Sequence, residues 1–248
     1  DDKEAWKLVD EITEAFQYYL LKASNTLAKE RGACEYFDKT KYSDGILPID
    51  SYKKDVDDLV NRKLSYNWNS LRKDIKESGL RHSTLSAQMP SESSSVVSNA
   101  TNGVEPPRDF LSIKKSKKGT LKQIVPDYNR LKNFYTLLWE MKSNEGYINT
   151  ISVMQKYFDQ AISGNWSYNP ENYKDGEVPT SVMANDLLTT YKLGWKTSYY
   201  QNTYDAKSDV DEPSHSVGWH DDVKDDTKPR EEFKTDEEDE ESCEACAI

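Results

Sequence analysis

The first 202 residues of this 248-residue chain predict an α/β fold. Long segments with apolar residues every three or four positions indicate helices, and short segments rich in β-branched and aromatic residues indicate strands. In the second half they alternate as strand, helix, strand, helix, strand. The strands are few, and the first helix has no strand before it. We therefore expect part of an α/β domain rather than a whole one.

The first half of this region predicts three helices and one strand. The N-terminal helix covers residues 1–30 and ends at Gly32. Its expected apolar stripe comprises Trp6, Val9, Ile12, Phe16, Leu20, Ala23 and Leu27. Further helices are predicted over Ser51–Val60 and over Trp68–Glu77, the latter ended by Gly79, and the alternating segment Arg81–Gln88 predicts a strand.

The second half predicts a short helix in SESSSVVSN after Pro90, and then a β-hairpin in FLSIKKSKKGTLKQIV. The hairpin turn is expected at Lys117-Lys118-Gly119. The remaining elements are helices over Tyr128–Met141, Tyr147–Ala161 and Pro179–Leu193, the last ended by Gly194, and strands over Ser163–Tyr168 and Lys196–Asn202.

Charge divides the chain at the end of this region. Residues 203–248 hold 17 Asp and Glu against 5 Lys and Arg, a net charge of −12, whereas residues 1–202 carry +1. We therefore expect a folded body over residues 1–202 and a flexible acidic tail over residues 203–248. The neutral body lacks the basic surface of a nucleic-acid-binding protein.

The sequence also argues against a membrane or secreted protein. No apolar run approaches the ~20 residues of a membrane span, and no signal peptide is visible. The chain has only 3 Cys, which argues against a disulfide scaffold. We interpret the chain as cytoplasmic. It opens DDKEAW without an initiator Met, so a fragment or a processed product is expected.

The loop Met89-Pro90-Ser91-Glu92-Ser93-Ser94-Ser95 runs from a predicted strand into a helix N-terminus. Backbone N–H groups and the positive end of the helix dipole point outward together there, and serine hydroxyls add donors suited to a phosphate. Ordinary N-capping by serine explains the same residues. Both interpretations remain open from the pattern.

Tyr199 and Tyr200 are adjacent on the last predicted strand. Tyrosine is a common strand residue, so ordinary strand packing explains them. Neighbouring strand residues normally face opposite sides. If the two phenols stacked instead, an oxidising equivalent could pass between them, each phenol losing a proton as it loses an electron.

Cys243 and Cys246 end the acidic tail in a Cys-x-x-Cys spacing. Zinc would need two further ligands, and His215 and His220 lie more than 20 residues upstream. Two inert thiols on a solvated tail are another interpretation. The third interpretation is a mild dithiol reductant. The surrounding carboxylates would raise the pKa of its thiols, and the flexible tail would carry it to a distant site. A flexible tail of this length spans roughly 35–40 Å.

Several long segments, in order, are similar to the large (alpha) subunit of class I ribonucleotide reductase. They are YYLLKASNTLAKERGACEYF, YSDGILPIDSYKKDV, GLRHSTLSAQMPSESSSVVSNATNGVEPPR, VPDY, LLWEM and DLLTTYKLGWKTSYYQNT, followed by the C-terminal dithiol. The resemblance covers residues 1–202 and returns at the last positions. It implies the C-terminal part of a ten-stranded α/β barrel with flanking helices, in an enzyme that reduces ribonucleoside diphosphates to deoxyribonucleoside diphosphates.

The resemblance also implies roles for individual residues. It assigns Pro90, Ser91, Glu92, Ser93 and Ser94 to the substrate diphosphate. It makes Tyr199 and Tyr200 a stacked radical relay from the small subunit. It makes Cys243 and Cys246 a shuttle that re-reduces the active-site disulfide and is itself reduced by thioredoxin or glutaredoxin. The family commonly spaces its tail cysteines further apart, and Ser93 stands where Thr is more usual.

The resemblance implies partners as well. The family's thiyl-radical cysteine, its reducing cysteine pair and its catalytic glutamate belong to upstream segments. This chain is therefore expected to bind no metal or cofactor itself and to work only with the N-terminal part of the large subunit and a small subunit that carries the metal-radical cofactor. The alternative is a non-catalytic interaction module with a redox-responsive acidic tail. It predicts a stable monomer without an exposed apolar face.

Overall fold

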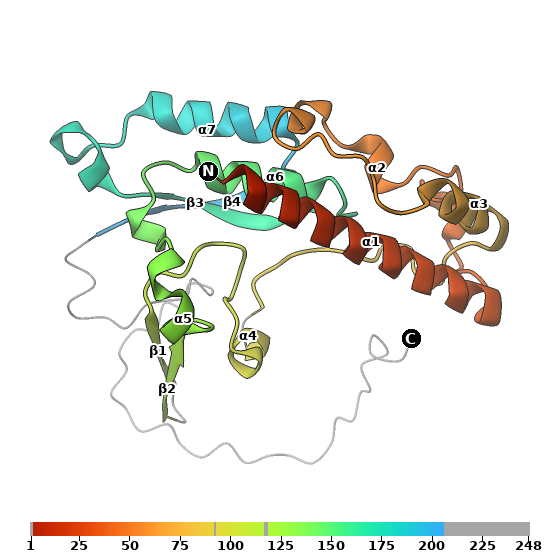
Figure 1. Ribbon diagram of the computed structural model, residues 1–248, viewed down its shortest axis with the longest axis horizontal. Helices are drawn as coiled ribbons and strands as arrows, with labels where there is room; N and C mark the ends of the chain where they lie inside the picture. Colours follow the sequence, from red (N-terminus) through yellow and green to blue (C-terminus); the bar gives the residue numbers. More distant parts are fainter. Residues whose placement is uncertain (1, 92, 117–118, 206–248) are drawn as a thin grey trace, which may run out of the picture. The chain divides into compact units, whose positions relative to one another are not determined.

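Helices and strands are mixed along the chain, which confirms the α/β class (Figure 1). The structure, a computed structural model, describes residues 2–91, 93–116 and 119–205. The helices are α1 Lys3–Arg31, α2 Pro48–Ser51, α3 Trp68–Ser78, α4 Ser93–Ser98, α5 Tyr128–Leu131, α6 Glu145–Gln155 and α7 Thr180–Leu193. The strands are β1 Leu111–Ser116, β2 Gly119–Ile124, β3 Ser163–Tyr168 and β4 Thr197–Thr203. Short 3-10 turns cover Phe37–Lys39, Lys54–Asp58, Lys132–Phe134, Leu138–Glu140, Pro170–Asn172 and Lys174–Gly176.

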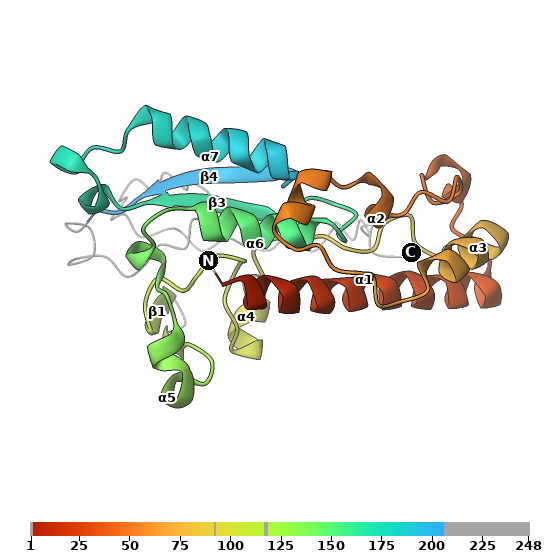
Figure 2. The same ribbon diagram turned by 45° about the horizontal axis from the view of Figure 1, so that its top comes forward.

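The strands form two separate pairs in the described residues. β1 and β2 form the predicted antiparallel hairpin, with Leu111 opposite Ile124. β3 and β4 are parallel and lie side by side in both views (Figures 1 and 2). Parallel strands need a crossover connection, and α7 supplies it here.

The predicted strand over Arg81–Gln88 is wrong, because only Gln88 forms a bridge, to Ile162 beside β3. The backbone N–H groups of this segment bond elsewhere. His82 N donates to Ser24 Oγ at 3.2 Å, and Leu85 N donates to Asp159 Oδ2 at 2.6 Å. Side-chain oxygens of α1 and of the segment before β3 thus accept N–H groups that would otherwise pair with a neighbouring strand.

The core of the β3–β4 region is formed by α6, β3 and the entry to β4. Trp195, just before β4, donates its indole N–H to Ile162 O at 2.6 Å, and its ring meets that of Tyr147 on α6 edge-on. Both rings are buried, as is Trp166 on β3. α6 contacts α1 on one side and α7 on the other, and both views show it between them (Figures 1 and 2).

α1 begins and ends almost where it was predicted, and Gly32 caps it with a positive φ of 83°. The apolar stripe is not the buried face, however. Ile12 and Phe16 are 57% and 50% exposed, and of the seven predicted residues only Trp6 is buried. The buried face comprises Trp6, Asp10, Thr13, Glu14, Gln17, Leu21, Ser24, Asn25 and Ala28. Most of its members are polar, so hydrogen bonds and ion pairs hold this face to its neighbours.

Three predicted helices are shorter than expected. Ser51–Val60 is replaced by α2 and the 3-10 turn Lys54–Asp58. Tyr128–Met141 breaks after Phe134, where Tyr135 is extended and the Leu138 N–H bonds Pro107 O at 2.9 Å. α6 stops at Gln155 instead of Ala161. The side chain of Gln155 donates to Gln160 O at 2.9 Å and accepts from Ile162 N at 3.1 Å, which fixes the turn into β3.

The other predictions are confirmed to within a residue or two. α3 ends at Gly79, α4 follows Pro90, β3 covers the predicted residues, and α7 runs to Gly194. Within the turn of the β1–β2 hairpin, Lys117 and Lys118 lie outside the described residues.

Candidate functional site

Tyr199 and Tyr200 lie at an irregular point of β4, where the register with β3 shifts. Gly164 pairs with Ser198, but Trp166 pairs with Gln201, so two residues of β4 face the single residue Asn165. This is a β-bulge, which re-aims side chains and is uncommon between parallel strands. It explains how neighbouring strand residues bring their rings together.

The two phenol rings are in contact. Their centroids are 4.2 Å apart and their planes meet at 61°. The predicted contact is therefore present, but the rings meet edge-on instead of stacking face to face. The side chains are 59% and 44% exposed, and hydrogen bonding with Tyr199 raises the pKa of Tyr200 above the ordinary phenol value. The two phenols are thus accessible and in contact with one another.

Asn165 connects this bulge to a carboxylate. Its Oδ1 accepts the N–H of Tyr200 at 3.1 Å, and its Nδ2 donates to Glu105 Oε1 at 2.8 Å. The backbone N–H of Asn165 donates to Glu105 Oε1 at 2.9 Å and to Tyr147 Oη at 3.1 Å. Both the backbone N–H and the side-chain carboxamide of Asn165, the residue opposite the bulge, are thus hydrogen-bonded.

The predicted anion loop precedes and includes the start of α4. Ser91 N donates to Asn102 O at 2.6 Å, and Ser94 N donates to Ser91 O at 3.0 Å, so the loop closes on itself. Pro90, Ser93 and Ser94 are exposed, whereas Ser91 is half-buried. The α4 helix has only 6 residues, so its dipole adds little and the hydroxyls must supply most of any anion affinity.

The far end of α4 is held by the hairpin. Gln123 on β2 donates from Nε2 to Ser95 O at 3.2 Å and to Ala100 O at 2.8 Å. Glu105 lies in the segment that leaves this loop, three positions after Asn102. The loop and the tyrosine pair, far apart in sequence, are therefore joined through Glu105 and Asn165.

Three predicted site residues lie outside the described residues. They are Glu92 in the anion loop and the tail pair Cys243 and Cys246. In the described part of the chain, no three His, Cys, Asp or Glu side chains gather where they could hold a metal ion. The search of the same residues for a membrane-crossing helix found none with the length and apolarity required.

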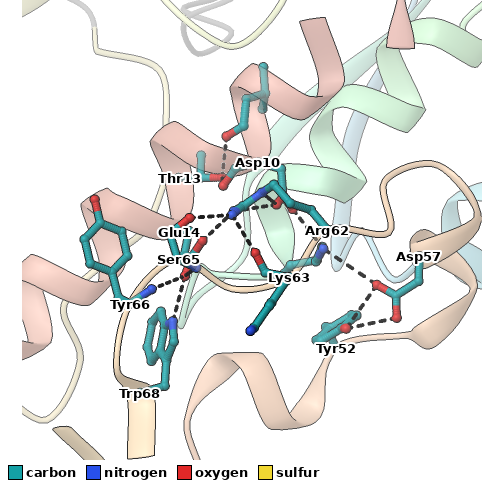
Figure 3. Close-up of polar contacts among 12 residues, drawn as sticks. Asp10, Thr13, Glu14, Tyr52, Asp57, Arg62, Lys63, Ser65, Tyr66 and Trp68 are labelled. Atoms are coloured by element: carbon teal, nitrogen blue, oxygen red, sulfur yellow. Dashed lines mark hydrogen bonds and ion pairs between the residues drawn. The ribbon is translucent and has the colours of Figure 1, made fainter. Parts of the chain in front are cut away.

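A second polar cluster lies under α1 and involves none of the predicted site residues (Figure 3). Arg62 Nε donates to Asp10 Oδ2 at 2.9 Å, and its Nη2 bonds Glu14 Oε2. Lys156, which directly follows α6, donates to Asp10 Oδ1 at 2.8 Å. Asp10, Glu14 and Lys156 are all buried. The two cations of this cluster thus lie against the carboxylates of Asp10 and Glu14, and Asp57 Oδ1 is 3.6 Å from Lys156 Nζ.

Glu14 is satisfied at both oxygens, as Figure 3 shows. Its Oε1 accepts the N–H of Ser65 at 2.8 Å and the indole N–H of Trp68 at 3.0 Å. Arg62 and Lys156 also line a cavity of about 460 Å³. Because their charges are already matched by Asp10 and Glu14, we interpret this cluster as the anchor of α1 and not as a ligand site.

The sequence interpretation missed Asn165 and Glu105. One signal for Asn165 was available, because asparagine is depleted in strands and here it stands within Ser163–Tyr168. Its partner Glu105 lies 60 positions away, and no short-range pattern joins the two.

Comparison with known proteins gives consistent matches. The family model described as "Ribonucleotide reductase, barrel domain" matches residues 1–201. The ribonucleoside-diphosphate reductase subunit alpha of Haemophilus influenzae is 59% identical over 211 residues, and subunit alpha of ribonucleoside-diphosphate reductase 1 of Escherichia coli K12 is 56% identical over 209. The subunit alpha of Enterobacteria phage T4 is 43% identical over 211 residues. These alignments cover 84–85% of this chain, which spans about 28% of the length of each relative.

Proposed function

The chain belongs to the ribonucleotide reductase barrel-domain family, and we propose that it is the C-terminal part of the large subunit of a class I ribonucleoside-diphosphate reductase. In this proposal the complete enzyme reduces ribonucleoside diphosphates to deoxyribonucleoside diphosphates, the precursors for DNA replication. Because the chain spans about 28% of its relatives' length, we expect it to be inactive alone.

The observation that carries this proposal is the contact between Tyr199 and Tyr200, with ring centroids 4.2 Å apart on an exposed strand. In the proposed relay, a tyrosyl radical on one ring takes one electron and one proton from the neighbouring phenol. The first ring becomes a phenol again and the second becomes the radical. The oxidant that starts the relay is the metal-radical cofactor of the small subunit. The final acceptor is a cysteine in the N-terminal part of the large subunit.

For substrate binding we propose the loop Pro90, Ser91, Glu92, Ser93 and Ser94. Ser93 and Ser94 are exposed, so their hydroxyls are accessible to a diphosphate. Charge-assisted hydrogen bonds of this kind are about twice as strong as neutral ones. Gln123 supports this role, because it bonds backbone carbonyls of α4 and of the residues after it without occupying the hydroxyls of Ser93 and Ser94.

For turnover we propose that residues 203–248 act as an acidic tail that carries Cys243 and Cys246. A thiolate of this pair attacks the active-site disulfide and forms a mixed disulfide. The second thiol then displaces the active-site cysteine, so two electrons and two protons pass to the active site. The Cys243–Cys246 disulfide that results is reduced in the same way by thioredoxin or glutaredoxin.

The partners in this proposal are the rest of the large subunit, the small subunit and the thiol reductant, in the cytoplasm. Exposed apolar side chains support the need for a partner. Leu8, Ile12, Phe16 and Tyr19 form a stripe on one face of α1, each at least 50% exposed. β4 pairs only with β3 among the described strands, so its other edge is free for a neighbouring strand. We propose a ten-stranded barrel as the assembly that covers these surfaces.

The experiment is reconstitution of ribonucleoside-diphosphate reduction from this chain, the N-terminal part of the large subunit and the small subunit. Tyr199→Phe and Tyr200→Phe should each abolish product with either a chemical dithiol or thioredoxin as reductant. Replacing Cys243 and Cys246 by Ser should abolish only the thioredoxin- or glutaredoxin-driven reaction. No product from the wild-type mixture, together with a compact monomer that binds neither partner, would favour the interaction module instead.

A further inference from the structure

The β-bulge of β4 is what brings Tyr199 and Tyr200 together. In a regular strand their side chains would point to opposite faces of the sheet. Here Ser198 pairs with Gly164 and Gln201 with Trp166, which leaves the two tyrosines opposite Asn165 alone. The close ring contact therefore depends on whatever holds the strand in this irregular register.

The side chain of Asn165 supplies a hydrogen-bond acceptor for the backbone of the bulge. The N–H of Tyr200 bonds Asn165 Oδ1 at 3.1 Å in place of a backbone carbonyl of β3. A bulge leaves its extra residue without a ladder partner, and a carboxamide is the right group to supply one, since it accepts on one side and donates on the other. The Nδ2 of Asn165 donates away from β4, to Glu105.

Glu105 fixes the orientation of that carboxamide. Its Oε1 accepts both N–H groups of Asn165, the side-chain one at 2.8 Å and the backbone one at 2.9 Å. A carboxylate only accepts, so it holds Nδ2 toward itself and Oδ1 toward Tyr200. Tyr147 on α6 also contacts this site, because its Oη accepts the Asn165 N–H at 3.1 Å. Burial and then the charge of Glu105 raise the pKa of Tyr147. Its phenol is therefore neutral at physiological pH.

We propose that Asn165, oriented by Glu105, is the positioning residue of the tyrosine pair. This rests on the proposed role of Tyr199 and Tyr200 as a relay. Asn165 touches neither phenol oxygen, and it acts by holding the backbone of Tyr200 in the bulge. Without the carboxamide, β4 can return to a regular alternation, which would turn the two rings to opposite faces of the sheet.

The first test is the reconstituted enzyme with a chemical dithiol. We expect Asn165→Ala to lower kcat about 100-fold, the effect of a misplacement of roughly 1 Å, with KM for the nucleotide unchanged. Asn172→Ala is the matched control, because Asn172 is also half-buried and donates to a backbone carbonyl, Met141 O at 3.0 Å, away from β4. It should keep both constants.

Three further variants separate positioning from loss of structure. Asn165→Asp still accepts the Tyr200 N–H but places a carboxylate beside Glu105. Because like charges raise the pKa of such a carboxyl, lowering the pH should restore a donor toward Glu105 and raise kcat in this variant relative to the wild type. Glu105→Gln keeps an acceptor oxygen and should retain most activity, whereas Glu105→Ala should not.

A direct readout uses the chain by itself. Fluorotyrosine placed at position 199 or 200 should change its fluorine chemical shift in Asn165→Ala and not in Asn172→Ala. Wild-type kcat together with unchanged fluorine shifts in Asn165→Ala would overturn the inference. If the wild-type mixture makes no product, the relay proposal fails, and the fluorine shifts still decide whether Asn165 sets the geometry of the pair.

Discussion

Lys156 Nζ lies 2.8 Å from Asp10 Oδ1, and both side chains are buried although they are 146 positions apart. The contact joins α1 to the end of α6, and Arg62 bonds the same carboxylate from the other side at 2.9 Å. Asp10 thus pairs with both cations, while Glu14 also pairs with Arg62 and Asp57 Oδ1 lies 3.6 Å from Lys156 Nζ. A buried ion pair adds little net stability compared with apolar packing, but the loss of Asp10 would leave the buried Lys156 with only the more distant carboxylate of Asp57.

We therefore expect Asp10→Ala to destabilise the chain by about 3–5 kcal/mol, since Lys156 and Arg62 would lose their shared partner. The measurement is urea unfolding of the full chain, followed by tryptophan fluorescence. Glu4→Ala is the control, because Glu4 pairs with Lys7 on the exposed face of the same helix. That exposed pair should contribute far less than the buried cluster. Equal losses in the two variants would show that the buried cluster does not anchor α1.

The same cluster explains what the sequence could and could not predict. The length of α1 followed from its periodicity and from Gly32, both local signals. Its buried face did not, because Asp10 and Glu14 are buried only by virtue of Arg62 and Lys156, which lie far along the chain. Hydrophobic periodicity predicts that apolar residues are buried, and it cannot detect a buried face whose carboxylates are paired with distant cations.

The candidate site shows the same division. The adjacency of Tyr199 and Tyr200 is visible in the sequence, and so is their place on a strand. Their ring contact depends on a register shift against Asn165, and register is a property of two strands together. The break in the helix predicted over Tyr128–Met141 likewise depends on a distant partner, Pro107 O.

Gly164 gives the next prediction, because a side chain there would collide with buried rings. A Cβ would lie 2.4 Å from Tyr147 Oη and 2.8 Å from Trp195 Cζ2. We expect Gly164→Ala to cost about 1–3 kcal/mol, as overpacking of a core does. In the double variant with Tyr147→Phe the nearest atom is gone, so the combined loss should be smaller than the sum of the single losses. Strict additivity would mean that the Tyr147 hydroxyl is not the source of the crowding.

Ser93 tests the proposed diphosphate loop. Its exposed hydroxyl is expected to donate to a phosphate oxygen, a bond worth about 1.5–3 kcal/mol when the acceptor is charged. Ser93→Ala should therefore raise KM for the nucleoside diphosphate at least about tenfold in the reconstituted enzyme. Ser93→Thr keeps the hydroxyl and should keep KM. If Ser93→Ala leaves KM unchanged, the hydroxyl does not bind the substrate and only caps α4.

Tyr42 supplies a prediction about pH. It is buried, and its Oη donates to Asp159 Oδ1 at 2.7 Å. Burial and then the charge of Asp159 raise the pKa of its phenol above the ordinary value of 10.0. Below about pH 10 the phenol keeps its proton in both the folded and the unfolded chain, so its contribution is complete and independent of pH. Above that pH the unfolded chain loses the proton first, and the free energy of unfolding must fall.

We expect urea titrations of the wild-type chain to give a free energy of unfolding that is level near neutral pH and declines above about pH 10, by up to about 1.4 kcal/mol per pH unit for each buried tyrosine. Tyr147, Tyr157 and Tyr168 add to the decline, since burial raises the pKa of each. Tyr42→Phe should lower stability at neutral pH by about 1 kcal/mol, through the lost hydrogen bond, and make the alkaline decline shallower. Tyr36→Phe, at a side chain that is 55% exposed, is the control for the loss of a surface hydroxyl. An alkaline slope as steep in Tyr42→Phe as in the wild type would show that this phenol ionises equally in the folded and unfolded chain.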